Sequence, residues 1–350
     1  MINPLCITGS MDGTIMFWRM DGDRIGMMND LPGHRNKRHV NAVVIGDRGE
    51  SLFIAYNRRI RRVQLPFLQF SEEIVTDKTI DNITQLDYSD VSRRLVSGSW
   101  DYSVRLFETD SGGSLYQSMK VTLTEMVMCV RIHPNQHTIF ATDHNGIAYY
   151  IDTRNQQKIP IRCNFLVEGE KIYELAVSPN GKYLIGGTNI GRTVVWHAND
   201  FGSPILINDK KLRVHPEFSG LLREHFAPSR TPEPYTAEYW ESRLHSSVIN
   251  KIRFKDDDTF AVASADGTVS LWSLHPNRNR QLVQHLDDWH RHCLWAYDTS
   301  FITYENNEYA LVASDKVIRQ WNIKTGRIHR YFTGHASIIT AMAFRDYSAA

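Results

Sequence analysis

The sequence predicts an all-β protein in the form of a β-propeller, a closed ring of seven small sheets. Three observations lead to this prediction. A turn residue stands six positions before a large apolar residue seven times along the chain. Most of these pairs recur at intervals of 44 or 45 residues, and the two ends of the sequence resemble complementary parts of one repeat. A repeat of about 40 to 45 residues with several short strands is typical of a propeller blade.

The spacing is clearest in four repeats, and the stretch "SADGTVSLWSL" at 264–274 is one of them. The clear pairs are Asp12 with Trp18, Asp101 with Phe107, Asp266 with Trp272, and Asp315 with Trp321. Three weaker pairs keep the spacing but not the residue types: Asn57 with Val63, Asn145 with Ile151, and Ile190 with Trp196. Seven pairs predict seven blades.

Each repeat favours antiparallel hairpins over helices, because short alternating segments are separated by turn residues. In "GTVSLWSL" we expect Val269 and Leu271, with Ser273, on one face of a strand. The Asp-Gly pair before them suits the tight turn that joins two antiparallel strands. We therefore expect four short strands in each repeat.

The two ends of the chain predict how the ring closes. "LCITGSMDGTIMFW" matches the second and third strands of a blade, and the missing first strand is expected at Ile338–Phe344. If this segment pairs with the strand around Leu5–Thr8, the ring has no exposed sheet edges that could template aggregation. Seven repeats account for about 308 residues, so we expect residues 1–350 to form a single domain.

Gly-His pairs at Gly33-His34 and Gly334-His335 precede apolar segments, which together with the Asp and Trp positions is typical of WD repeats. In such blades a His, a Ser or Thr, the turn Asp and the Trp form a buried hydrogen-bond chain that satisfies their polar groups. We predict that these residues are structural rather than catalytic. The set consists of Asp12, Trp18, His34, Asp101, Asp266, Trp272, Asp315, Trp321 and His335.

The fifth and sixth apolar positions, Trp196 and Trp272, are 76 residues apart, which is much longer than the usual interval of 44 or 45 residues. This difference predicts an insertion at about 198–242. Its prolines disfavour a continuous strand, and a short helix is expected at 218–226. Two interpretations are open: a surface loop that packs on its own blade, or a binding element. The candidate exposed anchors of a binding element are Tyr235, Tyr239 and Trp240.

The composition argues against a global electrostatic attraction to nucleic acid or to membranes. Forty Lys and Arg balance 39 Asp and Glu, so the formal net charge is +1, and partners must be recognised by local shape. We expect neither a membrane span nor a secretory leader. The four cysteines are scattered, which suits reduced, buried thiols in the reducing environment of the cytosol or the nucleus. They are Cys6, Cys129, Cys163 and Cys293.

Two polar clusters raise alternative functions. "HLDDWHRHC" contains possible zinc ligands, but no second cluster completes a four-ligand set, so we favour a loop or rim cluster. "NRRIRRV" could contact phosphates, but no aromatic residues are interleaved to stack on bases, so we expect its arginines on the outer surface or a rim. The residues concerned are His285, His290, His292 and Cys293 in the first cluster, and Arg58, Arg59, Arg61 and Arg62 in the second.

The sequence contains no Gly-rich phosphate loop, nucleophile elbow or His-Glu zinc helix, which are the common local signatures of an active site. We therefore predict no catalytic residues, no bound metal and no cofactor. An enzyme with an active site in the central channel is the minority alternative, and it would require turnover by the isolated chain.

Several segments outside the repeat consensus resemble one family, the small WD-repeat, G-protein-beta-like subunits of the TOR (target of rapamycin) kinase complexes. The resemblance covers most of the chain and is strongest at its end, from Thr325 through His335 and in "AFRDYS". The segments are "HVNAVVI" at 39–45, "MCVRIHPNQHTIFATDHNGIAYYID" at 128–152, "CLWAYDTSF" at 293–301 and "IRQWNIKTGRIHRYFTGHASIITAMAFRDYS" at 318–348.

The resemblance implies a non-catalytic subunit that binds and stabilises the kinase domain of TORC1 or TORC2 and supports growth and nutrient signalling. The implied partners are a helical insertion in the C-terminal lobe of the kinase and the other subunits of the complex, without nucleic acid or direct membrane insertion. The implied location is the cytoplasm, or endomembranes through the kinase complex. The alternative is another WD-repeat adaptor, such as a ubiquitin-ligase substrate receptor or a G-protein-beta-like scaffold.

Two segments that lead into first strands match the family and indicate the kinase-binding rim. They are "RHVNAV", with His39 and Asn41, and "CLWAY", with Trp295. Large amphipathic side chains on a rigid rim are typical interface anchors. The alternative for Trp295 is a core position at the start of a strand.

Overall fold

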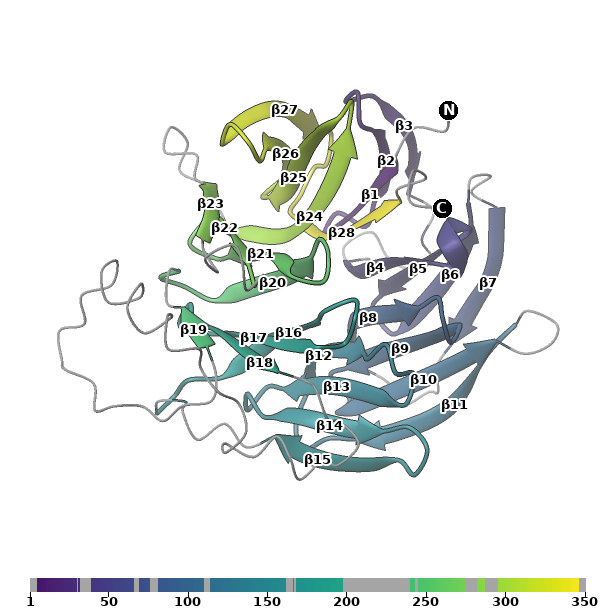
Figure 1. Ribbon diagram of the computed structural model, residues 1–350. Coiled ribbons are helices and arrows are strands. Elements are labelled where there is room, and N and C mark those ends of the chain that lie inside the picture. The colour runs from purple at the N-terminus through teal and green to yellow at the C-terminus, as the bar shows by residue number, and fades with distance from the viewer. Residues whose placement is uncertain are drawn as a thin grey trace, which may run out of the picture.

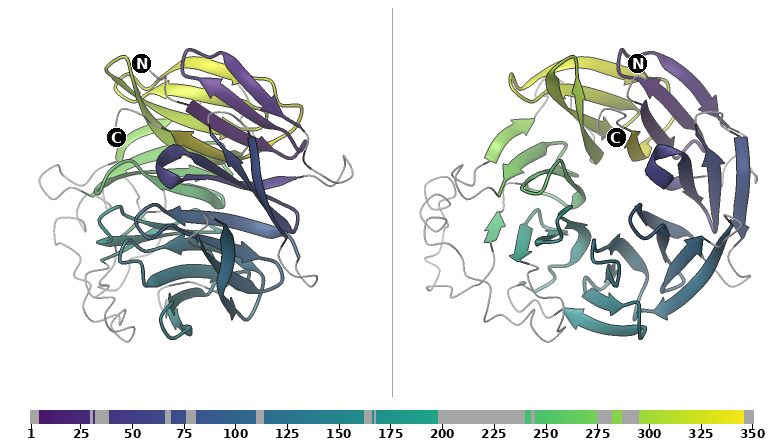
Figure 2. Two further views of the ribbon diagram at one scale, coloured as in Figure 1. Left: turned by 90° about the vertical axis from the view of Figure 1, so that its right-hand side faces the viewer. Right: turned by 45° about the vertical axis from the view of Figure 1, so that its right-hand side comes forward.

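A computed structural model describes residues 5–29, 31, 39–65, 69–75, 81–109, 114–161, 166, 168–197, 240–242, 245–274, 282–286 and 295–345. These residues form 28 strands in seven four-stranded antiparallel sheets. Figures 1 and 2 show the sheets arranged as blades around a central axis. The predicted all-β, seven-bladed propeller is confirmed.

Each blade contains an inner strand, two middle strands and an outer strand, in that spatial order. The inner strands are β4 (Val40–Gly46), β8 (Ile83–Ser89), β12 (Val127–Ile132), β16 (Ile172–Val177), β20 (Ile249–Phe254), β24 (Ala296–Tyr304) and β28 (Ile339–Arg345). The outer strands are β3 (Arg24–Met28), β7 (Gln69–Val75), β11 (Leu115–Thr122), β15 (Gln157–Ile161), β19 (Trp240–Ser242), β23 (Leu282–Leu286) and β27 (Arg327–Thr333).

The middle strands come in pairs joined by tight turns. They are β1 (Leu5–Ser10) with β2 (Ile15–Arg19), β5 (Ser51–Tyr56) with β6 (Arg59–Gln64), β9 (Arg94–Ser99) with β10 (Ser103–Thr109), β13 (Thr138–Asp143) with β14 (Ala148–Asp152), β17 (Tyr183–Thr188) with β18 (Thr193–His197), β21 (Thr259–Ser264) with β22 (Val269–Ser273), and β25 (Asn307–Ser314) with β26 (Val317–Asn322). A short 3-10 turn, η2 (Asp47–Gly49), follows β4.

The core lies between neighbouring blades, so the middle strands are buried on both faces. Every residue of β1, β5, β13 and β17 is buried. Ile7 of β1 and Ile54 of β5 belong to one apolar cluster between two blades. The outer strand β3 is mostly exposed. A strand with one solvent-exposed face alternates apolar and polar residues. Because each sheet here packs against two others, its middle strands instead carry small and apolar residues on both faces.

The ring closes by pairing segments from opposite ends of the sequence. β28 pairs with β1 in antiparallel register, with Cys6 opposite Phe344 and Thr8 opposite Met342. Figure 1 shows these two strands side by side. The predicted closure is confirmed, with the strand beginning at Ile339 rather than Ile338. The inner strands also pack in sequence around the axis, β28 against β4 included.

Two expectations require correction. Arg61 does not lie on the outer surface or a rim, because it is buried, with 8% of its surface exposed, in the third strand of its blade. The insertion ends earlier than predicted, because Trp240–Ser242 form β19, which pairs with β18 and completes a blade. Without β19, the backbone groups on one side of the middle strand β18 would be unpaired. The short strand β19 therefore covers an edge that could pair with another chain.

Several predicted features lie outside the described residues: His34, Cys163, His290, His292, Cys293, and residues 198–239 of the insertion. No helix in the described part of the chain is long and apolar enough to cross a membrane.

Candidate partner-binding face and central channel

One face of the ring carries both the turns between the middle strands and the segments that lead into the inner strands. Backbone hydrogen bonds join these two kinds of segment. Met11 N donates to Ile338 O, Trp100 N to Asn82 O, and Ala265 N to Val248 O. We call this the top face, and the inner strands run from it toward the opposite face. Side chains placed here project from turns that the rigid sheets position.

In the closing blade, the predicted polar residues form one chain beneath the top face. Trp18 Nε1 donates to Thr8 Oγ1 at 2.9 Å, and His335 Nε2 lies 2.8 Å from the same oxygen. On its other side, His335 Nδ1 lies 2.9 Å from Thr14 Oγ1, and the Asp12 carboxylate accepts from Thr14 N at 2.8 Å. The chain joins the turn of one strand pair to the segment that leads into β28.

A second chain contains a residue that the sequence analysis missed. His245 Nε2 lies 2.7 Å from Ser270 Oγ, which accepts from Trp272 Nε1 at 2.7 Å. His245 Nδ1 lies 3.1 Å from Asp266 Oδ2. His245 corresponds in position to His335, but Leu244 precedes it, so the Gly-His signal is absent.

The other two predicted aspartates are bound differently. In the blade of Asp101 an arginine takes the place of the histidine: Arg105, with 1% of its surface exposed, donates to Asp101 Oδ2 at 2.7 Å and also to Ser103. Asp315 has a positive φ of 54° and accepts through its backbone oxygen from Ile339 N at 2.7 Å. Among the described residues, its carboxylate takes part in no comparable chain, while Trp321 is buried against neighbouring strands.

The hydrogen-bond chain around Asp266 predicts a measurable effect of acid on stability. Burial alone would raise the pKa of Asp266, but hydrogen bonds from His245, Thr268 and the backbone of Ser246, with the charge of His245, hold this pKa far below 3.8. A depressed pKa in the folded state stabilises the fold above the unfolded pKa, and this contribution is lost as the pH falls below about 4.

We therefore expect Asp266→Asn to lower the free energy of unfolding by about 1.5–3 kcal/mol at pH 7, the typical range for hydrogen bonds to a charged group. The difference from the unmodified chain should shrink between pH 5 and pH 2. Urea unfolding followed by circular dichroism measures both. Asp257→Asn, at an exposed aspartate, is the control that should change neither. A difference that stays constant with pH would refute the role of the carboxylate.

The three predicted partner-binding residues lie on the top face in different environments. Trp295 precedes β24, has 52% of its surface exposed, and its ring centroid lies 5.8 Å from that of Tyr297. This exposure contradicts the alternative of a core position. His39 is half-buried in front of β4. Asn41 Nδ2 donates to Ile83 O of the next inner strand at 2.8 Å, so Asn41 also ties two blades together.

Further exposed apolar side chains lie on the same face and were not predicted. Met11 has 38% of its surface exposed, and Trp100 and Tyr102 have 43% each. They project from the β1–β2 and β9–β10 turns. With Trp295 and His39 they span four consecutive blades of the ring. The sequence does contain a signal for two of them, because Trp100 and Tyr102 flank Asp101 at positions where the turn does not need an apolar residue.

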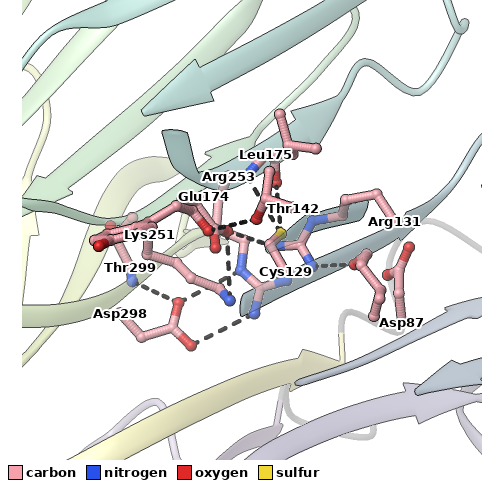
Figure 3. A network of polar contacts seen from close by, with 12 residues as sticks. Asp87, Cys129, Arg131, Thr142, Glu174, Leu175, Lys251, Arg253, Asp298 and Thr299 are labelled. Carbon is pink, nitrogen blue, oxygen red and sulfur yellow. Dashed lines mark hydrogen bonds and ion pairs between the residues drawn. The ribbon is translucent and has the colours of Figure 1, made fainter. Parts of the chain in front are cut away.

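The central channel contains a belt of charged residues that the sequence analysis also missed. A cavity of about 250 Å³ is lined by residues from all seven inner strands. Figure 3 shows the charged side chains that converge from five of these strands. The belt consists of Asp87 on β8, Arg131 on β12, Glu174 on β16, Lys251 and Arg253 on β20, and Asp298 on β24.

The belt is closely paired. Arg131 donates to Glu174, and both side chains are at least 90% buried. Lys251 Nζ lies 3.5 Å from Glu174 Oε1. Arg253 lies 3.4 Å from both oxygens of Asp298, whose carboxylate also accepts from the Met342 backbone at 2.9 Å. Three cations thus face three carboxylates.

Burial shifts the pKa values of two belt residues, Asp87 and Lys251, toward their neutral forms. It raises the pKa of Asp87 although Arg131 and the Ile132 backbone N–H oppose it. Burial also lowers the pKa of Lys251 although Glu174 opposes it. In contrast, the two remaining inner strands, β4 and β28, place the apolar residues Ala42 and Ala341 at equivalent positions. The described residues contain no group of three or more His, Cys, Asp or Glu that could hold a metal ion.

Comparisons with known proteins agree with this architecture. The family described as WD domain, G-beta repeat matches residues 76–108 and 241–273. A protein named Protein LST8 homolog from Drosophila pseudoobscura pseudoobscura is 24% identical over 271 residues, which cover 76% of this chain and 72% of that protein. Its namesake from Drosophila melanogaster is 23% identical over 270 residues, with the same coverage.

A similar solved structure is the Cps50 (Swd1) β-propeller domain of Myceliophteria thermophila, with a TM-score of 0.67 and 15% identity over 88% of this chain and 91% of that domain. This likeness concerns the fold alone. The relatives named LST8 homolog confirm the resemblance of the sequence to the G-protein-beta-like subunit of TOR complexes.

Proposed function

We propose that this chain is a non-catalytic subunit that binds and stabilises the kinase domain of a TOR-type protein kinase complex. The WD-repeat propeller and the LST8-like relatives point to a scaffold rather than an enzyme. The observation that carries the proposal further is the half-exposed indole of Trp295 on the top face, within a segment that resembles the family. Tryptophan is among the side chains that most often dominate interface energies.

The proposal includes the location and the role of the complex. The chain would act in the cytoplasm, where the kinase complex would carry it to endomembranes, and would support growth and nutrient signalling through TORC1 or TORC2. Its partners would be the C-terminal lobe of the kinase and the other subunits of the complex. A different WD-repeat adaptor would bind other proteins through the same face.

We expect Trp295→Ala combined with His39→Glu to abolish co-purification of the kinase, because the change removes a large anchor and adds a charge to the contact. The melting temperature should stay within a few degrees, since neither residue is fully buried. Asn41 is left unchanged because its substitution would also remove the hydrogen bond to Ile83 of the next blade. A loss of kinase binding could then result from a loss of stability.

Affinity purification of the tagged chain with quantitative mass spectrometry measures the result. Tyr331→Ala is the matched control, since Tyr331 has 42% of its surface exposed on β27, the outer strand of the blade that contains Trp295. Kinase recovered at unchanged yield with the folded double variant would disprove the proposed contact. Recovery of an unrelated set of proteins with the unmodified chain, and no kinase, would favour the adaptor alternative.

A further inference from the structure

The channel opens on the top face through a ring of side chains at the second position of each inner strand. Four of them donate hydrogen bonds to a backbone oxygen of the next inner strand: Asn41 to Ile83, Thr84 to Val127, Asn250 to Ala296, and Thr340 to Val40. The other three, Met128, Tyr173 and Tyr297, are half-buried and line the mouth of the cavity. Interblade bonds thus fix the mouth at β28, β4, β8 and β20, and larger side chains line it at β12, β16 and β24.

Lys251 lies one step below this mouth, at the third position of β20, and lines the same cavity. Its ammonium group can donate three hydrogen bonds. The described residues supply two acceptors: Glu174 at 3.5 Å, and the side-chain oxygen of Gln85 in the amide orientation that satisfies its neighbours. The Lys251 side chain is 13% exposed, so one N–H remains for a group that enters the cavity.

The carboxylates beside Lys251 are committed to other groups. Glu174 is shared with Arg131, which donates to it directly. Asp298 accepts from Arg253 and from two backbone N–H groups, those of Thr299 and Met342. Neither carboxylate is available to Lys251 alone.

We infer that the channel mouth receives the carboxylate of an Asp or Glu side chain from the protein docked on the top face, with Lys251 as its ion-pair partner. This inference rests on the proposed function, because the protein expected on this face is the TOR-type kinase. An entering cation would be repelled by Lys251, and an apolar group would leave its N–H without an acceptor. A carboxylate supplies the hydrogen-bond acceptor that the third N–H of Lys251 needs. Burial lowers the pKa of Lys251, and a neighbouring carboxylate opposes this effect because it favours the charged ammonium form.

The cavity suits a single side chain rather than a whole segment of backbone. Its volume of about 250 Å³ equals that of roughly eight water molecules at the density of the liquid. The exposed residues around the mouth, Trp295 among them, suit a protein partner, which would present the carboxylate from its own surface. Exclusion of water by such a partner strengthens the ion pair with Lys251.

Carbodiimide cross-linking of the assembled complex tests this inference without any substitution. The reagent activates a carboxyl group, and a lysine amine in contact with it displaces the resulting urea to form an amide bond. We expect peptide mass spectrometry to find Lys251 joined to an Asp or Glu of the kinase. If other lysines cross-link to the kinase and Lys251 does not, this inference is wrong. If no kinase co-purifies, the proposed function fails as well.

Substitutions provide a second test. Lys251→Met keeps the aliphatic stem and removes the charge, so we expect kinase affinity to fall at least tenfold, whereas Lys251→Arg should stay within about threefold. Lys255→Met is the matched control, because Lys255 follows β20 at the other end of the channel and donates to Glu308 at 2.5 Å. Kinase affinity and melting temperature are measured for each variant.

Unchanged kinase affinity of a folded Lys251→Met variant would overturn the inference. If that variant does not fold, the cross-linking result on the unmodified chain decides.

Discussion

Removal of residues 334–350 is expected to open the ring and to leave an insoluble or protease-sensitive product. The deletion removes β28, so the backbone of β1 loses its partner and becomes an exposed edge. It also removes Ile339 and Met342 from the core and His335 from the chain that holds Trp18. Burial of one such apolar side chain contributes about 1.5–3 kcal/mol, so the total loss approaches the 5–15 kcal/mol typical of a whole domain.

Soluble yield, limited proteolysis and the melting transition measure this effect. A chain that ends at residue 345 is the matched control, since it keeps all of β28, and we expect it to behave like the unmodified protein. A product truncated at 333 that stays monomeric with an unchanged melting transition would show that β28 does not hold the ring closed.

Loss of Glu174 is expected to have the second-largest effect, about 3–5 kcal/mol of unfolding free energy. Glu174→Ala leaves the buried guanidinium of Arg131 without its carboxylate and takes the nearest carboxylate from Lys251. Replacing both members of the Arg131–Glu174 pair by methionine should recover much of this loss, because a buried pair exchanged for apolar side chains of similar size is often neutral.

Chemical denaturation of Glu174→Met, Arg131→Met and the double methionine variant completes a double-mutant cycle, in which we expect a strong coupling between the two positions. Arg154→Met, which removes a largely exposed arginine from its pair with Asp152, should change stability little. A change of less than about 1 kcal/mol for Glu174→Ala would mean that the charged belt does not contribute to holding the ring together.

The parts of the fold that follow from short-range patterns were predictable from the sequence. The spacing of Asp12 and Trp18, repeated along the chain, predicts the middle strand pairs, because a tight turn needs its residues at fixed local positions. The strand at Ile338–Phe344 was predictable for a similar reason, since it supplies the one element that the first repeat lacks. The end of the insertion was predicted too late, because β19 has only three residues and carries no repeat mark.

The site was less predictable because its residues meet only through the closure of the ring. Arg131 and Glu174 are each the single charged residue of their strand, and Lys251 shares its strand with Arg253. The distances between Arg131, Glu174 and Lys251 depend on the packing of three blades. His245 lacked the preceding glycine, and Arg105 substitutes for a histidine that the repeat pattern expects. The exposure of Trp295 could not be decided from its position at the start of a strand.

The pairing of β1 with β28 also determines when this protein can finish folding in the cell. Thr340 Oγ1 donates to Gly9 O, a contact between residues 331 positions apart. At a synthesis rate of about 5–20 residues per second, roughly 20–70 s separate the appearance of these two residues on the ribosome. Throughout this interval the first blade lacks its inner strand and exposes an edge. An unpaired strand edge can pair with other chains, so β1 is open to aggregation during translation, before any partner can bind the completed ring.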